Sequence, residues 1–243
     1  MKNTIKFDNK NTLVFAHRGL SGLERENTSS AFVAAGNRSY FGIETDIHRT
    51  SDGKFAAVHD GTLNRVAGRP VTVETTPLDL VQEVVLYDTD DTKNRYDLRV
   101  PTLENYISIC KKYGKHCVLE LKSDFSDEEI SAIIQIIEAQ EYLHEVTFIA
   151  FGFENLVRVR AQRPGQSCQF LTGNCPDEVI EMLKAHKIDI DIYHATLTKE
   201  LVDALHAAGI VINCYTVDSP GRAEELAAWG VDQITSNILE GIR

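Results

Sequence analysis

The sequence predicts an α/β fold of one kind, a closed parallel (β/α)8 TIM barrel with a small insertion after its second strand. Short apolar, β-branched runs alternate with helical stretches along the chain, which is the pattern of repeated βα units. Eight such runs within 243 residues suit one barrel domain. The alternative, a doubly wound open sheet, usually has a Gly-rich phosphate loop after its first strand, but here that strand ends in His17-Arg18-Gly19. We therefore expect a single catalytic domain over residues 1–243.

The expected strands and helices alternate in the order that a barrel requires. The strands are expected at 12–19, 42–48, 116–122, 145–151, 166–172, 187–194, 210–217 and 231–236, with a short extra strand at 54–58. The helices are expected at 27–37, 101–114, 127–141, 154–162, 177–186, 198–209 and 221–230. The helix at 101–114 starts near a proline and ends at Gly114, which matches the usual preferences of helix ends.

The alternation breaks between residues 61 and 100. Within this segment, 76–88 is consistent with a short helix and a turn, and 88–97 is a polar loop. We interpret residues 61–100 as an insertion between the second strand and its helix. Long segments of this kind often carry function.

Composition and charge limit the classes of partner. The formal net charge of −11 argues against nucleic acid and anionic membranes, although a few local cations can still bind a small anionic substrate. The five cysteines lack CxxC spacing and are expected to be reduced and mostly buried. The N-terminus has no apolar signal region and no run of 18 apolar residues occurs, so we expect a cytoplasmic protein without an integral membrane segment.

Acidic residues fall where barrel strands are expected to end, which is where such barrels place their chemistry. Glu44 and Asp46 stand two apart on one strand, so their side chains share a face. Glu120 and Lys122 repeat this spacing on the third strand. Three carboxylates are hard oxygen ligands for Mg²⁺ or Ca²⁺, and a divalent cation would remove the repulsion between them.

Basic residues and histidines complete this set. His17 and Arg18 end the first strand, and His59 ends the extra strand. Arg18 and Lys122 supply positive charge for a phosphate, while two histidines on different strands can act as general base and general acid. Together with a metal, these groups describe phosphodiester cleavage.

Plainer interpretations exist for single residues. A Glu-x-Asp pair on a strand is commonly a salt-bridge pair. His48 shares the face of that pair, and is either a further metal ligand or, more commonly, a rim residue. Asp60 either orients His59 or caps a turn. The expected clustering of these acids, histidines and basic residues at one rim of the barrel favours an active site over the plainer interpretations.

These residues resemble a known family. The chain carries His17-Arg18-Gly19, Glu26-Asn27-Thr28 with Ala31-Phe32, Glu44-x-Asp46, Thr50-x-Asp52-Gly53, His59-Asp60, Leu63-x-Arg65, Pro101-Thr102-Leu103 and Glu120-x-Lys122. In this order the motifs resemble the glycerophosphodiester phosphodiesterase family over nearly the whole chain. The resemblance implies a TIM barrel that hydrolyses glycerophosphodiesters to an alcohol and glycerol 3-phosphate, with Mg²⁺ or Ca²⁺.

The resemblance also implies roles for single residues. Glu44, Asp46 and Glu120 would be metal ligands, His17 and His59 the acid–base pair, and Arg18 and Lys122 phosphate ligands. It further suggests a route in which the glycerol hydroxyl attacks first and water then opens a cyclic phosphate. Which histidine is the base in which step is left open.

The chain departs from the family pattern at three places. Arg25 stands where the family favours proline. The seventh strand ends in Tyr215-Thr216-Val217-Asp218 instead of the usual Trp and Asn, and the last ends in Thr235-Ser236-Asn237-Ile238 instead of Thr-Asp-x-Pro. We expect the two strand endings to affect specificity, not chemistry. Tyr215 is expected either to pack on the glycerol carbons or to pack at the barrel top.

Two other functions remain open. One is hydrolysis of a lysophospholipid or another phosphodiester, with Val84-Val85-Leu86-Tyr87 of the insertion either forming an apolar groove or being buried in it. The other is a catalytically silent barrel that binds a phosphoester. The sequence leaves open the alcohol portion of the substrate, Mg²⁺ versus Ca²⁺, the oligomeric state and whether the insertion acts as a lid.

Overall fold

Eight parallel strands close into a barrel in the computed structural model, which describes residues 3–242. β2 (Leu13–Ala16) pairs with both β10 (Gln233–Ser236) and β3 (Gly42–Arg49), which closes the ring. Between β10 and β3 lie, in order, β9 (Ile212–Tyr215), β8 (Asp189–Tyr193), β7 (Ser167–Thr172), β6 (Val146–Ala150) and β5 (His116–Leu121). The prediction of a closed (β/α)8 barrel is therefore confirmed.

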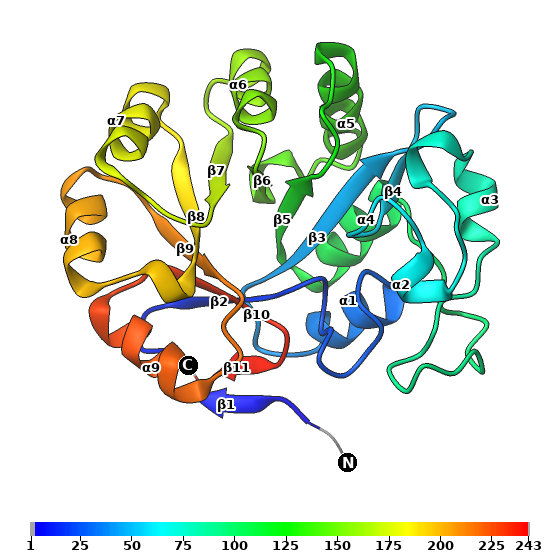
Figure 1. Cartoon of the computed structure of the whole chain (residues 1–243), viewed down its shortest axis with the longest axis horizontal. Coiled ribbons are helices and arrows are strands. Elements are labelled where there is room, and N and C mark those ends of the chain that lie inside the picture. Colours follow the sequence, from blue (N-terminus) through cyan, green and yellow to red (C-terminus); the bar gives the residue numbers. More distant parts are fainter. Residues whose placement is uncertain (1–2, 243) are drawn as a thin grey trace.

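Helices surround the strands and connect them (Figure 1). They are α1 (Ser29–Gly36), α4 (Leu103–Tyr113), α5 (Asp127–Ala139), α6 (Phe153–Gln162), α7 (Asp177–His186), α8 (Lys199–Ala207) and α9 (Pro220–Trp229), with 3₁₀ turns at Leu143–Glu145 and His194–Thr196. In α4, Thr102 and Asn105 form a capping box, and Gly114 ends the helix at a φ of 61°. Because each helix returns the chain to the same side, the C-terminal ends of the strands share one rim.

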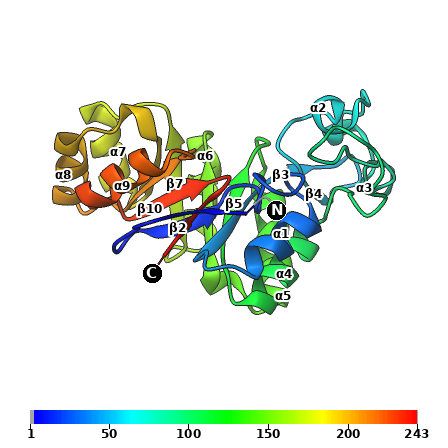
Figure 2. The same cartoon turned by 90° about the horizontal axis from the view of Figure 1, so that it is seen from below.

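The insertion forms a small unit beside the end of β3. It contains α2 (Asn64–Ala67), the 3₁₀ turn Val73–Thr75 and α3 (Leu78–Gln82), and Figure 2 shows it standing apart from the outer helices. The short strand β4 (Phe55–Ala57) leads into it and pairs antiparallel with the last residues of β3. Its own core consists of Ala56, Val58, Leu63, Val66, Ala67, Val73, Leu78, Val81, Leu86, Leu98 and Val100.

A second, two-stranded sheet was not predicted. β1 (Ile5–Phe7) and β11 (Leu239–Gly241) pair in parallel outside the barrel. Each strand has only three residues and β1 has two exposed ones, so neither shows the apolar pattern of a barrel strand. The carboxylate of Glu240 holds this sheet by accepting from Ser39 N at 2.8 Å and pairing with Lys6 Nζ at 2.7 Å.

Two expectations from composition can be compared with the structure. The five cysteines are unpaired, and four of them are buried while Cys175 is partly exposed, as predicted. No helix within residues 3–242 combines the length and apolarity needed to cross a membrane.

The departure at Arg25 has a structural role. Its guanidinium donates to the backbone carbonyls of Tyr87, at 2.6 Å, and Asp88 in the insertion. Beside it, Arg95 of the insertion pairs with Glu24 at 2.9 Å. An arginine at this position therefore fastens the insertion to the loop between β2 and α1, a contact that proline cannot make.

Replacing Arg25 by Ala is expected to loosen the insertion without melting the barrel. Two charge-assisted hydrogen bonds contribute about 1.5–3 kcal/mol each, so local opening should become at least about tenfold more frequent. Hydrogen exchange at the amides of Leu86 and Tyr87, which donate to Leu98 O and Val66 O, measures this opening. Arg38→Ala, which removes a contact to Ala34 O on α1, is the matched control. If the Leu86 and Tyr87 amides exchange as slowly in Arg25→Ala as in the parent protein, Arg25 does not tether the insertion to the loop between β2 and α1.

Candidate active site

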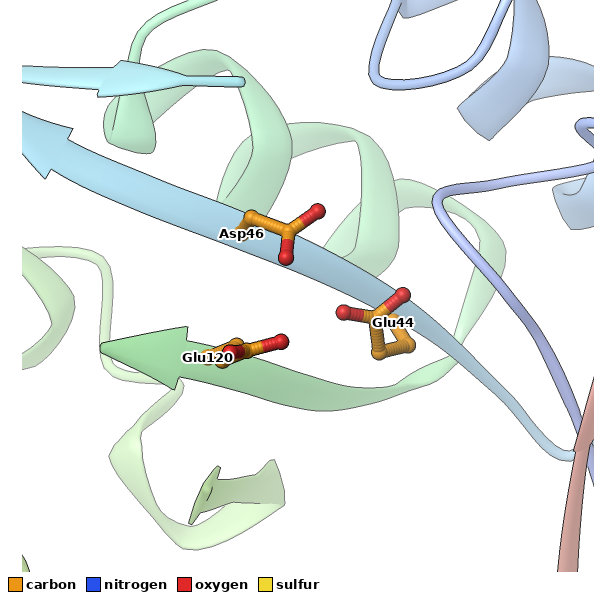
Figure 3. Close-up of side chains that lie close together, drawn as sticks. All are labelled: Glu44, Asp46 and Glu120. Atoms are coloured by element: carbon orange, nitrogen blue, oxygen red, sulfur yellow. The ribbon is translucent and has the colours of Figure 1, made fainter. Parts of the chain in front are cut away.

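Three carboxylates meet across the neighbouring strands β3 and β5. Parallel register places Asp46 directly opposite Glu120, and Glu44 lies two residues earlier on the same face. One oxygen from each residue lies within 4.8 Å of the others, and all three side chains are buried. Figure 3 shows the three carboxylates pointing toward one another from the two strands. Their arrangement suits a divalent cation with oxygen ligands.

The electrostatics of this cluster are unfavourable for three bare anions. Burial first, and then the charges of Asp46 and Glu120, raise the pKa of Glu44 well above its ordinary value. Burial and Asp46 raise the pKa of Glu120 to about 8. Asp46 Oδ1 accepts no hydrogen bond from any residue in the range 3–242. A buried oxygen without a donor, beside two carboxyls that resist ionisation, is the state that a bound cation relieves.

Two basic side chains flank the acids. Arg18 Nε lies 3.6 Å from Asp46 Oδ2, and Lys122 Nζ lies 2.9 Å from Glu120 Oε1 and 3.7 Å from Asp46 Oδ1. Burial raises the pKa of Asp46, but Arg18, His59 and Lys122 outweigh it and lower that pKa to about 2. Asp46 is thus ionised, while its neighbours Glu44 and Glu120 are held closer to neutrality.

The turn after β2 is shaped to bring Arg18 to the acids. Arg18 has a φ of 53° and Gly19 a φ of 74°, which is why the strand ends at Ala16 and not at residue 19. In this conformation the backbone N–H of Arg18 donates to Glu44 Oε2 at 2.7 Å. A Cβ on Gly19 would come within 2.7 Å of Ala31, so α1 requires glycine here. Left-handed backbone at a non-glycine residue is costly and is often kept for function.

His59 is held by a hydrogen bond to Asp60, which begins a chain of ion pairs. Its Nδ1 lies 2.7 Å from Asp60 Oδ1, and the other oxygen of Asp60 accepts from Arg65 Nε at 2.8 Å. Arg65 also pairs with Glu26, which in turn pairs with Arg18 at 2.9 Å. The insertion, through Arg65, therefore links the two sides of the site. Burial lowers the pKa of His59, and the hydrogen bond to Asp60 opposes that shift.

His17, the residue that follows β2, faces the same site. Its Nδ1 lies 2.7 Å from Asn237 Oδ1, at the end of β10. Burial first, and then the charge of Arg18, lower the pKa of His17 to about 4. The imidazole is therefore neutral at pH 7, with one ring nitrogen engaged by Asn237.

A cavity of about 230 Å³ connects these groups. Its wall consists of His17, Arg18, Glu44, His59, Glu120, Lys122, Ile149, Phe151, Leu171, Asp191, Tyr215, Thr216 and Thr235. Tyr215 donates to Thr172 O at 3.2 Å, and its ring lies 6.2 Å from the rings of Phe151 and Tyr193. The cavity thus has a charged side at β2, β3 and β5 and an aromatic side formed by Phe151, which follows β6, and Tyr215 on β9.

Asp191 lies in the wall of this cavity on the side away from the acid cluster. Its Oδ2 accepts from Asn213 Nδ2 at 3.1 Å, while its Oδ1 has no hydrogen-bond partner within the described chain. The side chain is buried, and burial raises its pKa to about 8. At neutral pH this carboxyl is therefore mainly protonated.

Asp191→Asn is expected to stabilise the protein at high pH only. Because the carboxyl has a pKa of about 8 when folded and about 3.9 when unfolded, it costs stability that grows as pH rises between these values. The variant should melt several degrees above the parent protein at pH 9 and at the same temperature at pH 4, as measured by calorimetry. Asp203→Asn on the exposed face of α8 is the control. A difference in melting temperature that does not change with pH would contradict this expectation.

Comparison with known proteins agrees with this geometry. A family model described as the glycerophosphoryl diester phosphodiesterase family matches residues 17–240. The chain belongs to this family. It is 28% identical over 240 residues to a glycerophosphodiester phosphodiesterase of Bacillus altitudinis, covering 93% of this chain and 95% of that protein. A glycerophosphodiester phosphodiesterase of Bacillus subtilis (strain 168) is 26% identical over 246 residues, covering 93% and 83%.

Solved structures show the same architecture. The structure of a phosphodiesterase from Oleispira antarctica, in complex with the product sn-glycerol-3-phosphate, superposes with a TM-score of 0.86 at 25% identity and covers 93% of each chain. Membership of the glycerophosphoryl diester phosphodiesterase family makes the protein a phosphoric diester hydrolase, as the motifs indicated.

The structure brings the predicted site residues of this family member together. Those that line the cavity are His17, Arg18, Glu44, His59, Glu120, Lys122 and Tyr215, and Asp46 completes the acid cluster. Their individual roles stay predictions. His48 is not part of the acid cluster; it is buried, and its Nε2 lies 3.1 Å from His59 O. Asp60 contacts His59, which favours the orienting interpretation over the turn cap.

The structure places one residue of these strand endings beside a predicted catalytic histidine. The side chain of Asn237, in a strand ending that we expect to affect specificity and not chemistry, contacts His17 Nδ1 directly. Asp218 in turn contacts Asn237. Sequence reasoning missed these contacts because the residues follow three different strands, which come together only when β2, β10 and β9 pair in the barrel.

Other site residues were also missed. Asp191 gave one signal, an acid that alternates with Ile190 and Ile192 along a strand otherwise expected to be apolar. Asn27 belongs to the Glu26-Asn27-Thr28 motif, which by itself indicates no role for it, and its Nδ2 donates to Asp46 Oδ2 at 2.8 Å. Asn27 has a left-handed φ of 50°, and this backbone conformation turns its amide toward the acid cluster. Because the sequence does not specify backbone angles, this contact could not be predicted.

Proposed function

We propose that the protein hydrolyses glycerophosphodiesters to glycerol 3-phosphate and a free alcohol, using a divalent cation held by Glu44, Asp46 and Glu120. The observation that carries this proposal is a buried three-carboxylate cluster that shares one cavity with two histidines, an arginine and a lysine. The structure of the Oleispira antarctica phosphodiesterase, which has the same fold, is a complex with the product sn-glycerol-3-phosphate, and this supports the same product here. Mg²⁺ and Ca²⁺ are the proposed ions, because both prefer carboxylate oxygens.

Each residue of the site would have a separate role in this reaction. A cation bound at the acid cluster would supply Lewis-acid stabilisation of the charge on the phosphoryl oxygens. Arg18 and Lys122, already held at the cavity wall by Glu26 and Glu120, would bind the phosphate and keep it in place. His17 and His59 would move protons to and from the reacting oxygens. Tyr215 would cover the glycerol carbons from the aromatic side of the cavity.

Release of glycerol 3-phosphate from glycerophosphocholine and glycerophosphoethanolamine tests this proposal. We expect release with Mg²⁺ or Ca²⁺ and none in EDTA, with activity restored when the ion is returned. The same assay ranks the two ions. Folded protein that releases no glycerol 3-phosphate with either ion would overturn the proposal.

A second substrate class is favoured by one observation. Phe151 of the cavity wall is 54% exposed, and Tyr193, whose ring lies 6.2 Å from that of Tyr215, is 44% exposed, so an acyl chain of a lysophospholipid would find an apolar surface there. The groove considered in the insertion is less suitable, because Leu86 is buried in the core of the insertion. Turnover of lysophosphatidylcholine that falls with Phe151→Ser, while glycerophosphocholine turnover holds, would support this second class.

A further inference from the structure

The two histidines of the site have different kinds of partner. The Nδ1 of His59 faces a carboxylate, Asp60, which is itself paired with Arg65. The Nδ1 of His17 faces the amide oxygen of Asn237 at 2.7 Å. An anion stabilises a protonated imidazole, whereas a neutral amide does so much less. The surroundings of the two histidines therefore differ, even without substrate, in how strongly they stabilise a protonated ring.

The orientation of the Asn237 amide is fixed by Asp218. Asp218 Oδ2 lies 2.6 Å from Asn237 Nδ2. Since a carboxylate only accepts hydrogen bonds, the nitrogen of the amide must face Asp218 and the oxygen must face His17. The assignment of the two amide atoms thus follows from the chemistry of the neighbour.

Asp218 is itself held in place by residues at the end of β10. Its Oδ1 accepts from Ser236 Oγ and from the backbone N–H of Asn237, each at 2.9 Å. On the other side, Ser21 Oγ lies 2.7 Å from Asn237 Oδ1. The two strand endings and the turn after β2 therefore form one network around the amide.

This network determines which nitrogen of His17 carries the proton. An amide oxygen cannot donate, so the nitrogen that faces it, Nδ1, must carry hydrogen. In the neutral ring Nε2 is then the nitrogen with the free lone pair. Because His17 lines the cavity and its Nδ1 is engaged, Nε2 is the atom available to a substrate. The lowering of the His17 pKa to about 4 by burial and Arg18 agrees with a ring that starts neutral.

We propose that Asn237, oriented by Asp218, is a positioning residue that holds His17 as the Nδ1–H tautomer and so makes Nε2 the general base of the reaction. The role in the reaction rests on the proposed function. Nε2 takes the proton of the attacking hydroxyl, whose oxygen forms the new P–O bond. The P–O bond to the alcohol breaks with its electron pair on the leaving oxygen, which takes a proton from His59, the histidine with the anionic partner.

The tautomer is measured directly in the parent protein. Long-range ¹H–¹⁵N correlation spectra of the imidazoles, with His17→Asn used to assign the His17 signals, report which nitrogen is protonated. We expect a protonated Nδ1 and an unprotonated Nε2 at pH 7. The Nε2–H tautomer in the parent protein would overturn the proposal whether or not the proposed function holds. Conversely, if His17 is the Nδ1–H tautomer but the protein hydrolyses no glycerophosphodiester, the proposed function alone is overturned.

Two variants separate positioning from a structural role. Asn237→Leu keeps the volume but removes the acceptor; we expect kcat to fall about 10- to 100-fold with little change in KM, and the His17 ring to populate both tautomers. Asn37→Leu, which removes an amide contact to Val33 O at the end of α1, is the matched control and should keep full activity. If Asn237→Leu changes only thermal stability, the residue has a structural role and the proposal fails.

The double variant Asp218→Asn/Asn237→Asp exchanges the two side chains and keeps their total charge. His17 Nδ1 would then face a carboxylate, so the tautomer should persist while the acidic limb of the pH profile of kcat/KM moves to higher pH by about one unit or more. A profile that stays in place in a folded, active double variant would contradict a direct contact between residue 237 and the catalytic base.

Discussion

Glu44→Gln is expected to abolish turnover and, at the same time, to stabilise the metal-free protein. Glu44 is buried beside Asp46 and Glu120, and burial with these charges raises its pKa well above the ordinary value. A raised carboxyl pKa in the folded state means that stability is lost as pH rises through the unfolded pKa and toward the folded one. Glutamine keeps an acceptor for the backbone N–H of Arg18 but carries no charge.

Activity should change in the opposite direction. Removing one of three charged ligands weakens the cation site, and several kcal/mol of lost charge stabilisation correspond to a decrease in kcat/KM of about 10³-fold or more. Melting curves in EDTA at pH 4 and pH 8, with activity at saturating Mg²⁺, measure both effects. We expect a higher melting temperature at pH 8 but not at pH 4.

An exposed glutamate provides the control for this variant. Glu141 has a side chain that is 91% exposed, and Glu141→Gln should change neither activity nor melting temperature. A Glu44→Gln protein that keeps metal-dependent turnover would remove Glu44 from the metal site. A lower melting temperature in EDTA at pH 8 would show that the acids do not repel one another in the metal-free state.

The contrast between β3 and the turn after β2 shows what the sequence could reveal. Glu44 and Asp46 could be placed together because side chains two apart on a strand share a face, and Glu120 because strand ends in a barrel share a rim. These arguments use regular geometry, which a sequence expresses as spacing. The fold could be predicted for the same reason, because eight repeated βα units are the pattern of a closed parallel barrel.

Contacts between irregular segments could not be predicted in this way. The contact of Asn237 with His17 depends on the register of β10 against β2 and on a turn in which Arg18 adopts a left-handed φ. The tether from Arg25 to the carbonyls of Tyr87 and Asp88 depends on how the insertion folds over its own small core. Such contacts join residues with no fixed spacing, so neither the partner of His17 nor the tether of the insertion leaves a pattern in the sequence.

The different partners of the two histidines lead to a prediction about the leaving group. If His59 donates its proton to the leaving alcohol, His59→Asn should lower kcat/KM on glycerophosphocholine by about 10³-fold, within the usual range for a general acid. The loss should shrink to about tenfold or less on the p-nitrophenyl ester of glycerol phosphate, because p-nitrophenolate leaves without a proton. KM should change little, since Arg18 and Lys122 still bind the phosphate.

His17→Asn is the informative counterpart, because a base acts on the attacking hydroxyl whichever group leaves. Its loss in kcat/KM should be equal on the two substrates. His144, whose side chain is 71% exposed, provides a control in His144→Asn, which should be fully active. The two roles would be reversed if His59→Asn lost the same kcat/KM on both substrates. They would also be reversed if His17→Asn recovered kcat/KM on the p-nitrophenyl ester only. In that case the carboxylate of Asp60 would support the base, and the amide of Asn237 would face the acid.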